Sequence, residues 1–213
     1  MMKKFAYLAI SAALGLTCGN AFAVENCTKI TATGHPAYPV IAFKDGDNIA
    51  GAAPELVANI AKTLKVPLES KYMGTWEEAQ AATRDGKADL IFGIYYNDAR
   101  AEYLDYVQPA FMYDDVAVFV VKGKEFSFKG KDDLIGKKGV TNKGESYGNE
   151  FDAFMKDTLD VTRADGIGEA FKTLVSGKAD YLIAGYYPGV AETAKDELKG
   201  KVVPLDQALL TAE

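Results

Sequence analysis

The chain has 213 residues, of which 48% are hydrophobic, 25% charged and 11% aromatic. This composition is typical of a globular protein and excludes disordered, collagen-like and disulfide-scaffold chains. The net charge is −6, and no block of Lys or Arg provides the basic surface that phosphate binding needs. We therefore expect no nucleic-acid partner.

The first 23 residues have the pattern of a cleavable signal peptide. Lys3 and Lys4 precede an apolar run from Phe5 to Leu16, and the segment ends in Ala21-Phe22-Ala23, which fits a signal-peptidase site. A buried N-terminal helix or a membrane anchor is the alternative, but the run is short for a membrane span. We predict an exported protein whose mature chain has a net charge of −8, since cleavage removes two of 24 basic residues and none of 30 acids.

Cysteine and histidine are too scarce for a metal site. Cleavage leaves Cys27 and His35, which cannot form the usual zinc ligand sets. Cys27 lacks a partner for an internal disulfide, so its thiol is either buried or paired with a segment outside this chain. We interpret His35, beside Pro36, as a loop residue that shapes a turn rather than as a base. Without a G-x-S-x-G elbow or a Gly-rich phosphate loop, we expect no catalytic residue, no metal and no cofactor.

Strands and helices are expected to alternate in the first half of the chain. Apolar patterns predict strands at Lys29–Thr33, Val66–Tyr72 and Ala88–Ile94, the last resembling a strand covered on both faces. A helix is expected from Pro54, with an apolar stripe at Leu56, Val57, Ile60, Ala61 and Leu64. Thr75 to Glu78 form a capping-box pattern for a second helix that ends near Gly86. This alternation predicts an α/β fold with a largely parallel sheet.

One helix–turn–strand pattern occurs twice. Residues 78–96 read EAQAATRDGKADLIFGIYY and residues 169–187 read EAFKTLVSGKADYLIAGYY, with 8 of 19 positions identical. Coincidence between two ordinary turns is the alternative. We favour two similar lobes, each with a tyrosine pair at the carboxyl end of a strand, where open α/β sheets bind ligands.

A strongly β-prone run, DVAVFVVK at Asp115–Lys122, lies between the two repeated units. We predict a first lobe at residues 24–115, a hinge-crossing strand at 116–122 and a second lobe at 123–213. No Gly/Ser-rich linker separates these lobes, which favours a stiff hinge over a flexible tether.

Aromatic side chains fall in expected loops or at the ends of elements, where rings offer apolar contact and a cation–π face to a ligand. They are Tyr38, Trp76, Tyr95, Tyr96, Tyr186 and Tyr187. Each alone is as readily a packing residue, but the repeated tyrosine pair favours a binding role.

Arg100 follows the strand at Ala88–Ile94, where its guanidinium is placed to hold a carboxylate. A surface salt bridge with Glu102 or Asp105 is an equal alternative.

Short motifs occur along nearly all of residues 29–187 in a characteristic order. They are Tyr38-Pro39, Phe43 to Asp47, Gly51, Pro54 to Leu56, Trp76, Gly86 to Ile91, Gly93 to Arg100, Asp133 to Val140 and Gly177 to Asp180. No single motif is specific, but the ordered set resembles the periplasmic solute-binding proteins of polar amino-acid ABC importers, solute-binding protein family 3.

The resemblance implies a two-lobed α/β fold like that of the type II periplasmic binding proteins, with mostly parallel sheets and flanking helices. Such a protein is a periplasmic monomer that clamps a small solute between its lobes and delivers it to an ABC permease in the inner membrane. In the family, an Arg at the position of Arg100 holds the α-carboxylate of the ligand, so Arg100→Ala is expected to abolish binding and leave the fold intact. Ser146 matches a hydroxyl residue that assists from the start of a second-lobe helix, whose N–H groups also favour an anion. Tyr95 matches a ligand-contacting position, and Tyr38 lies near a ring-stacking aromatic.

The chain departs from this family at two points. The acid that usually binds the α-ammonium of the ligand falls at Gly185, and a buried ammonium without a counter-charge costs several kcal/mol. Asp114, Asp115 or Glu145 are the candidates to replace it. Family members also return to the first lobe through a second crossing strand and C-terminal helices. This chain stops at Glu213, so we expect that return to be missing and an edge of the first sheet to be uncovered.

Three classes of function remain open at this point. The leading hypothesis is a non-enzymatic binding protein of an importer. The second is a ligand-sensing domain of a receptor system. The third is a periplasmic dehydratase-like enzyme on the same scaffold, with Glu145 or His35 as its acid or base.

Overall fold

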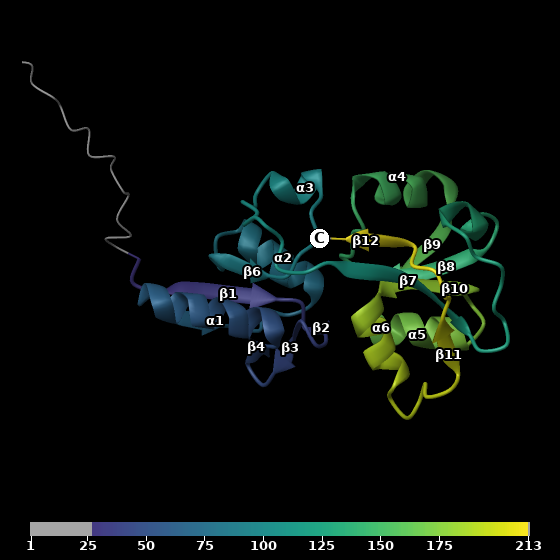
Figure 1. Ribbon diagram of the computed structural model, residues 1–213, viewed down its shortest axis with the longest axis horizontal. Coiled ribbons are helices and arrows are strands. Elements are labelled where there is room, and N and C mark those ends of the chain that lie inside the picture. Colours follow the sequence, from purple (N-terminus) through teal and green to yellow (C-terminus); the bar gives the residue numbers. More distant parts are fainter. Residues whose placement is uncertain (1–26, 213) are drawn as a thin grey trace, which may run out of the picture.

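The computed structural model of the protein describes residues 27–212. These residues form two α/β lobes side by side, and the strand β7 (Asp114–Val121) begins at the boundary between them and pairs with strands of the second lobe (Figure 1). The signal peptide predicted at residues 1–23 lies outside the described residues. Cys27 is exposed and not buried, and no helix within residues 27–212 has the length and apolar character to cross a membrane.

A three-stranded parallel sheet forms the centre of the first lobe. Its order is β5-β1-β6, with β1 at Ile30–Gly34, β5 at Leu68–Ser70 and β6 at Leu90–Phe92. A small antiparallel sheet consists of β2 (Ala37–Tyr38), β3 (Ala42–Asp45) and β4 (Asn48–Ala50). The helices are α1 (Ala52–Leu64), α2 (Trp76–Arg84) and the short α3 (Asp98–Ala101). The three strands and two helices predicted for this region are therefore present; β1 is shifted by one residue, and β5 and β6 are shorter than predicted.

The start of α2 is fixed by the capping box that the sequence predicts. Thr75 Oγ1 accepts a hydrogen bond from Glu78 N at 3.3 Å, and Glu78 Oε2 accepts one from Thr75 N at 2.7 Å. These bonds satisfy N–H groups that a helix start leaves without intrahelical partners. The cap thereby sets the register of α2, which carries Trp76 and Gln80 to the boundary with the second lobe.

The second lobe is built on a larger sheet of order β11-β7-β10-β8-β9, with β12 also paired to β7. The further strands are β8 (Lys138–Asn142), β9 (Asp160–Ala164), β10 (Tyr181–Gly185), β11 (Val202–Pro204) and β12 (Leu210–Ala212). The helices are α4 (Asn149–Thr158), α5 (Ile167–Val175) and α6 (Tyr186–Thr193), with a 3₁₀ turn at Lys131–Leu134. Apolar side chains are buried on both faces of β7 and β10, which places the core of this lobe around these two strands.

β7 adds antiparallel pairs to a sheet that is otherwise parallel as predicted. β8 is parallel to both β9 and β10, whereas β7 is antiparallel to β10, β11 and β12. The carboxyl ends of β8 and β10 face the first lobe, so a strand that arrives from that lobe runs in the opposite direction. β12 lies beside the start of β7, with Ala212 opposite Asp114, and ends between the two lobes (Figure 1).

The repeated motif forms the same local structure in both lobes. Asp89 Oδ2 accepts a hydrogen bond from Thr31 N in β1, and Asp180 Oδ2 accepts one from Lys138 N in β8, both at 2.8 Å. In return, Asp89 N donates to the Thr31 carbonyl and Asp180 N donates to the Lys138 carbonyl, both at 2.7 Å. This reciprocal pair ties each helix–strand turn to the start of a neighbouring strand. The repeat therefore reflects one structural unit used in both lobes.

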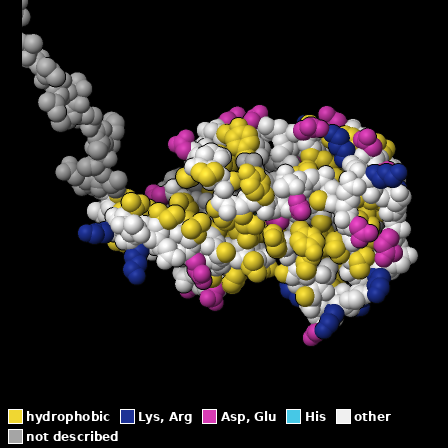
Figure 2. Space-filling model, viewed as in Figure 1, with side chains coloured by type: hydrophobic (Ala, Val, Ile, Leu, Met, Phe, Trp, Pro, Cys, Tyr) yellow, Lys and Arg dark blue, Asp and Glu magenta, His cyan; other side chains and the backbone are white. Residues whose placement is uncertain are grey.

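The apolar stripe of α1 is largely exposed, which differs from the usual placement of such a stripe in the core. Leu56, Ile60 and Leu64 are 42%, 50% and 63% exposed, whereas Ala53 and Ala61 are buried. The small side chains allow α1 to pack closely on the sheets and turn its larger side chains outward. Leu56 lines a groove of about 760 Å³ that continues over β6 and residues 103–112 and reaches Tyr38, Tyr95 and Asp114 at the lobe boundary. Hydrophobic side chains are spread over the visible face of the first lobe and over the lobe boundary (Figure 2).

We expect Ile60→Lys to change the free energy of unfolding by less than about 0.5 kcal/mol, because substitutions at exposed positions have small effects. Phe92→Ala is the matched comparison in the same lobe, since Phe92 is 1% exposed and its removal leaves a cavity. That variant is expected to lose about 3–5 kcal/mol. Urea denaturation of both variants measures the two values. A loss of several kcal/mol for Ile60→Lys would mean that this face of α1 is buried in solution.

Candidate functional site

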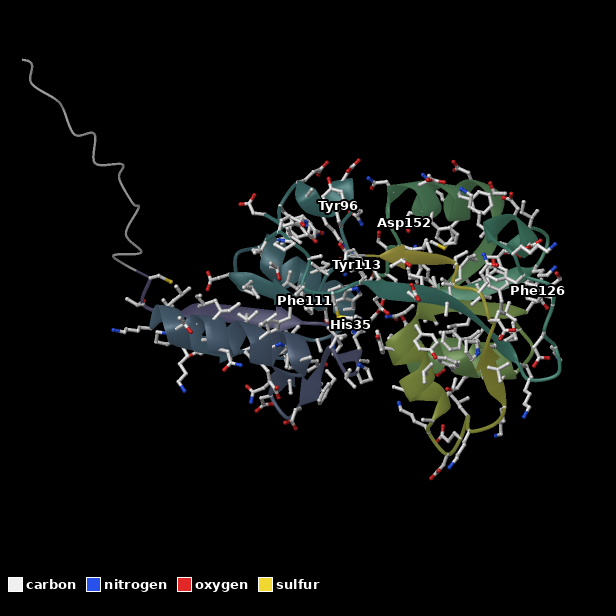
Figure 3. All side chains as sticks on the ribbon, in the orientation of Figure 1. His35, Tyr96, Phe111, Tyr113, Phe126 and Asp152 are labelled. Carbon is white, nitrogen blue, oxygen red and sulfur yellow. The ribbon has the colours of Figure 1, made fainter. Side chains whose placement is uncertain are left out.

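The two lobes meet at the carboxyl ends of their parallel strands, which is where open α/β sheets bind ligands. A cavity of about 10 Å³ lies at this boundary and is lined by His35 and Tyr38 of the first lobe and by Asn142, Glu145 and Gly185 of the second. His35 lies near the middle of the molecule, between the lobes (Figure 3). A volume of this size holds about one water molecule. A solute the size of an amino acid does not fit in this cavity, but the neighbouring groove of about 760 Å³, which borders Tyr38, Tyr95 and Asp114, is large enough for one.

Arg100 is 4% exposed, and its guanidinium bonds to uncharged oxygen atoms. Nε donates to Gln80 Oε1 at 3.1 Å, Nη1 to the Tyr95 carbonyl at 2.8 Å and Nη2 to the Gly144 carbonyl at 2.9 Å. Because a guanidinium has five N–H groups, two are left without a bond inside the described chain. Burial lowers the pKa of Arg100, and the nearby Glu145 carboxyl acts in the opposite direction. The alternative of a surface salt bridge is wrong, since the side chain is buried.

The Gly144 carbonyl joins the second lobe to two side chains of the first. It accepts the bond from Arg100 and a further bond from Gln80 Nε2 at 3.2 Å. Gly144 has a φ of +77°, and a Cβ there would lie 2.9 Å from Glu77 Cγ and 3.1 Å from Trp76 Cδ1. A side chain at this position would be strained and would push α2 away from the second lobe.

Ser146 is buried at the boundary, where its hydroxyl bonds to other side chains of the protein. It accepts a hydrogen bond from Asn97 Nδ2 of the first lobe at 2.6 Å and donates one to Asp152 Oδ2 of α4. Asp152 Oδ1 also accepts from Tyr147 N at 2.9 Å. The Ser146 hydroxyl and the Tyr147 N–H were expected to bind an anionic ligand. Both are bonded to the Asp152 carboxylate instead.

His35 and Glu145 form a second contact between the lobes. His35 Nε2 lies 3.2 Å from Glu145 Oε1, and His35 Nδ1 accepts a hydrogen bond from Ala37 N at 2.9 Å. The bond to Ala37 confirms that this histidine shapes a turn. The Trp76 ring packs on His35 with centroids 4.9 Å apart, and the Arg100 guanidinium carbon lies 5.7 Å from the centroid of Trp76. Trp76 is therefore part of the cluster between the lobes.

Tyr38 and Tyr95 converge on one carboxylate. Their hydroxyls donate to Asp114 Oδ2 at 2.6 and 2.7 Å, and the two hydroxyl oxygens are in contact with each other. Asp114 is 3% exposed, and its Oδ1 atom accepts no hydrogen bond from the described residues. Burial raises the pKa of Asp114 by more than the two tyrosine bonds lower it. Burial also raises the pKa of Tyr38 and of Tyr95, which keeps both hydroxyls protonated as donors.

Gly185 provides the space that this group occupies. A Cβ at position 185 would overlap the Tyr38 hydroxyl and lie 2.9 Å from Asp114 Oδ2. The sequence named Asp114, Asp115 and Glu145 as possible replacements for the acid expected at position 185. Of these three, Asp114 has its carboxylate where a side chain at 185 would begin. Glu145 contacts His35 and Asn142 instead, and Asp115 is exposed and accepts a bond from Thr211.

The other predicted aromatic residues are not brought to this boundary cluster. Tyr186 and Tyr187 are 42% and 44% exposed and pack on one another. Tyr96 is exposed and packs on Tyr106. The difference from Tyr95 arises because α6 begins directly after β10 and turns its tyrosines outward, whereas β6 is followed by a loop.

Gln80, Asn97 and Asp152 complete the cluster, although the sequence analysis gave them no role. Asn97 carries a local signal, since its side chain accepts a bond from Arg100 N at 2.7 Å and caps α3, as Asn commonly does. Asp152 lies in the first turn of α4, where acids are favoured. Gln80 lies on the buried face of α2, and no local pattern marks it.

Comparison with known proteins identifies both a family and a fold. The family model described as bacterial extracellular solute-binding proteins, family 3, matches residues 30–170. A histidine kinase sensor domain with similarity to periplasmic binding proteins has a TM-score of 0.74 and 23% identity, covering 88% of this chain and 81% of that one. An arginine-bound variant of ArgBP from T. maritima has a TM-score of 0.71 and 23% identity, covering 87% and 84%. The GluR0 ligand-binding core with L-glutamate has a TM-score of 0.73 and 14% identity, covering 86% and 81%. No curated protein sequence matches the chain.

The raised pKa of Asp114 implies a pH dependence of stability. In the unfolded chain this carboxyl ionises near a pKa of about 3.9, and in the folded protein it ionises at higher pH. The folded protein therefore binds more protons between the two pKa values, and the free energy of unfolding falls as the pH rises through that window. Asp114→Asn removes this contribution, so the stability of the variant relative to the parent is expected to rise from about pH 4 and then level off.

Urea denaturation over a series of pH values tests this expectation. Asp115→Asn is the matched control, because Asp115 is exposed and adjacent. A stability difference for Asp114→Asn that stays constant with pH would show that burial does not raise this pKa.

Proposed function

The chain belongs to the bacterial extracellular solute-binding proteins of family 3, and on this basis we propose that it captures a small carboxylate-bearing solute, an amino acid or a close analogue, between its lobes. The proposal includes export to the periplasm through the signal peptide at residues 1–23 and delivery of the solute to an ABC permease in the inner membrane. Arg100 is the residue that binds the carboxylate in this proposal.

The single observation that carries this function is the bonding of Arg100. Its guanidinium is buried between the lobes, and the Nη2 bond to the Gly144 carbonyl crosses from one lobe to the other. When the lobes separate, this bond breaks and leaves an N–H group free beside those that are already unbonded. A carboxylate then accepts two parallel bonds from the fork, and such charge-assisted bonds are stronger than a bond to a neutral carbonyl.

Closure follows from the contacts at the lobe boundary. The bonds Arg100–Gly144, Gln80–Gly144 and Asn97–Ser146 each join one lobe to the other, and β7 connects the lobes. A solute that contacts both lobes favours the closed form over the open one, as in hinge closure around ligands. The closed form presents surfaces of both lobes together, which is what a permease needs to distinguish a loaded protein.

We expect the melting temperature of the mature chain to rise in the presence of amino acids or other small carboxylates. Binding to the native state contributes about 2.7 kcal/mol at a hundredfold excess of ligand over Kd. A thermal-shift screen against amino acids, dicarboxylates and small peptides measures this effect. Agmatine, which is arginine without its carboxylate, is the control compound. Shifts produced by amines of this kind and by no carboxylate would contradict the proposal.

We expect Arg100→Lys to weaken carboxylate binding by roughly 10- to 100-fold, because a lysine keeps the charge but cannot form two parallel bonds. Arg100→Ala is a poorer test than the sequence suggested, since it would remove one donor from each of three buried acceptors and leave Gln80 Oε1 with none from the described residues. Isothermal titration with the ligand from the screen measures the loss. Arg84→Lys, at an exposed position on α2, is the matched control. Equal affinity in Arg100→Lys and the parent protein would exclude Arg100 as the clamp.

A sensing role is the second candidate, because a similar structure is a histidine kinase sensor domain. Sensing and import share the binding step and differ in the partner that reads the closed form. Ligand-dependent stimulation of ATP hydrolysis by an importer in proteoliposomes supports delivery, and a ligand-dependent change in kinase autophosphorylation supports sensing.

The enzymatic alternative depends on Glu145 and His35, which contact each other at 3.2 Å. While the lobes are together, His35 Nε2 and Glu145 Oε1 are bonded to each other, so neither atom is free to act on a substrate. Mass spectrometry of the bound ligand after prolonged incubation separates this alternative from reversible binding. A binding protein returns the ligand unchanged.

A further inference from the structure

Within residues 27–212, the lobe boundary holds a buried carboxyl group, Asp114, with no cationic side chain bonded to it. Asp114 is 3% exposed, and its Oδ1 atom accepts no hydrogen bond from residues 27–212. The groups that face it are the Tyr38 and Tyr95 hydroxyls and the carboxyls of Asp115 and Glu145, so its charged neighbours are acidic. Buried carboxylates are normally paired, and one left unpaired is costly. A cation supplied from outside the chain would satisfy it.

The surroundings of Asp114 fix its position. The Tyr38 and Tyr95 hydroxyls donate to Oδ2 at 2.6 and 2.7 Å, which leaves Oδ1 as the unused acceptor. Asp114, Tyr38 and Tyr95 line the groove of about 760 Å³, so the carboxylate borders open space at the lobe boundary. A side chain at 185 would displace this group, because its Cβ would lie 2.9 Å from Oδ2.

Tyr95 connects this anion to the buried cation of the site. Its carbonyl accepts a bond from Arg100 Nη1 at 2.8 Å, and its hydroxyl donates to Asp114 at 2.7 Å. Arg100 and Asp114 are therefore separated by about the length of one tyrosine, and neither is paired with the other. An α-amino acid carries its carboxylate and its ammonium group at a fixed short separation. Two opposite charges held apart and unpaired in one cleft are complementary to such a zwitterion.

We propose that Asp114 is the counter-ion for the ammonium group of the ligand, held in place by the positioning residues Tyr38 and Tyr95. The inference rests on the proposed function and deepens it, because it selects α-amino acids over carboxylates that lack an amine. Asp115 and Glu145 do not take this role, since Asp115 is exposed and Glu145 is bonded to His35. The specificity for the ammonium thus comes from the first residue of β7.

The test compares amino acids with the same acids lacking the amine. L-Glutamate, L-glutamine and L-arginine are titrated calorimetrically alongside glutarate, glutaramate and 5-guanidinopentanoate, using the mature chain, Asp114→Asn and Asp115→Asn. The mature chain is expected to bind at least one amino acid at least about 100-fold more tightly than its matched analogue, since one member of a buried ion pair is otherwise unpaired. Asp114→Asn is expected to reduce this preference to less than about tenfold, with Asp115→Asn unchanged.

Tyr95→Phe provides a second variant that keeps the carboxylate. Loss of one hydrogen bond to a charged group is expected to weaken amino-acid binding about tenfold and leave the analogue unaffected. A pH series adds a readout that a purely structural role would not change. Because the ammonium favours ionised Asp114, amino-acid affinity is expected to rise with pH from about pH 4 in the mature chain and to lose this rise in Asp114→Asn.

The possible failures are distinct. A preference for amino acids that survives Asp114→Asn overturns this inference and leaves the proposed function standing. Equal affinity of the mature chain for an amino acid and its deamino analogue has the same consequence. If the mature chain binds none of the six compounds and no carboxylate in the thermal-shift screen, the proposed function falls and this inference falls with it.

Discussion

A buried guanidinium must find hydrogen-bond acceptors, and Arg100 finds them on both lobes. The Gln80 amide and the Tyr95 carbonyl come from the first lobe, and the Gly144 carbonyl comes from the second. This requirement explains why residue 144 has no side chain, because only glycine allows its carbonyl to approach α2 so closely. The position of the guanidinium therefore depends on the capped start of α2, on the loop after β6 and on the contact between the lobes.

Asp114 is the opposite case, since its charge is buried without any ionic partner in the described chain. Two tyrosine hydroxyls stabilise one oxygen of the carboxylate, and the missing side chain at Gly185 makes room for them. The cost of burying this group appears in its raised pKa. A protein that keeps such a group gives up stability for chemistry at that position. The Arg100 guanidinium and the Asp114 carboxylate together place one positive and one negative group at the boundary between the lobes.

Much of this architecture is readable from the sequence because it depends on local patterns. The capping box at Thr75 and the repeated Gly-Lys-Ala-Asp turn predict structure within a few residues of themselves, and both form. Arg100 and Tyr95 were found because they follow a predicted strand at its carboxyl end. Tyr186 follows an equivalent strand but lies outside the cluster, because the next helix begins at once.

The contacts that cross between lobes were not readable in this way. The engagement of Ser146 by Asp152 and the pairing of Glu145 with His35 depend on how the two lobes are placed relative to one another. The exposed face of α1 is a similar case, since periodicity identifies an apolar stripe but does not state which side chains the sheets cover. The choice of Asp114 among three acids likewise required the position of Gly185 in three dimensions.

The hydrogen bonds that join the lobes also set a threshold for capture. The carboxylate site on Arg100 is complete only in molecules whose Arg100–Gly144 bond is broken, so the apparent dissociation constant equals the intrinsic one divided by the open fraction. If about one molecule in a hundred is open, the apparent constant is about a hundred times the intrinsic value. Each bond from Gln80 or Arg100 to the Gly144 carbonyl lowers that fraction. The sensitivity of the protein to dilute solute is thus governed in part by bonds between its own lobes, and the Gln80 bond can be changed while the guanidinium that recognises the carboxylate stays the same.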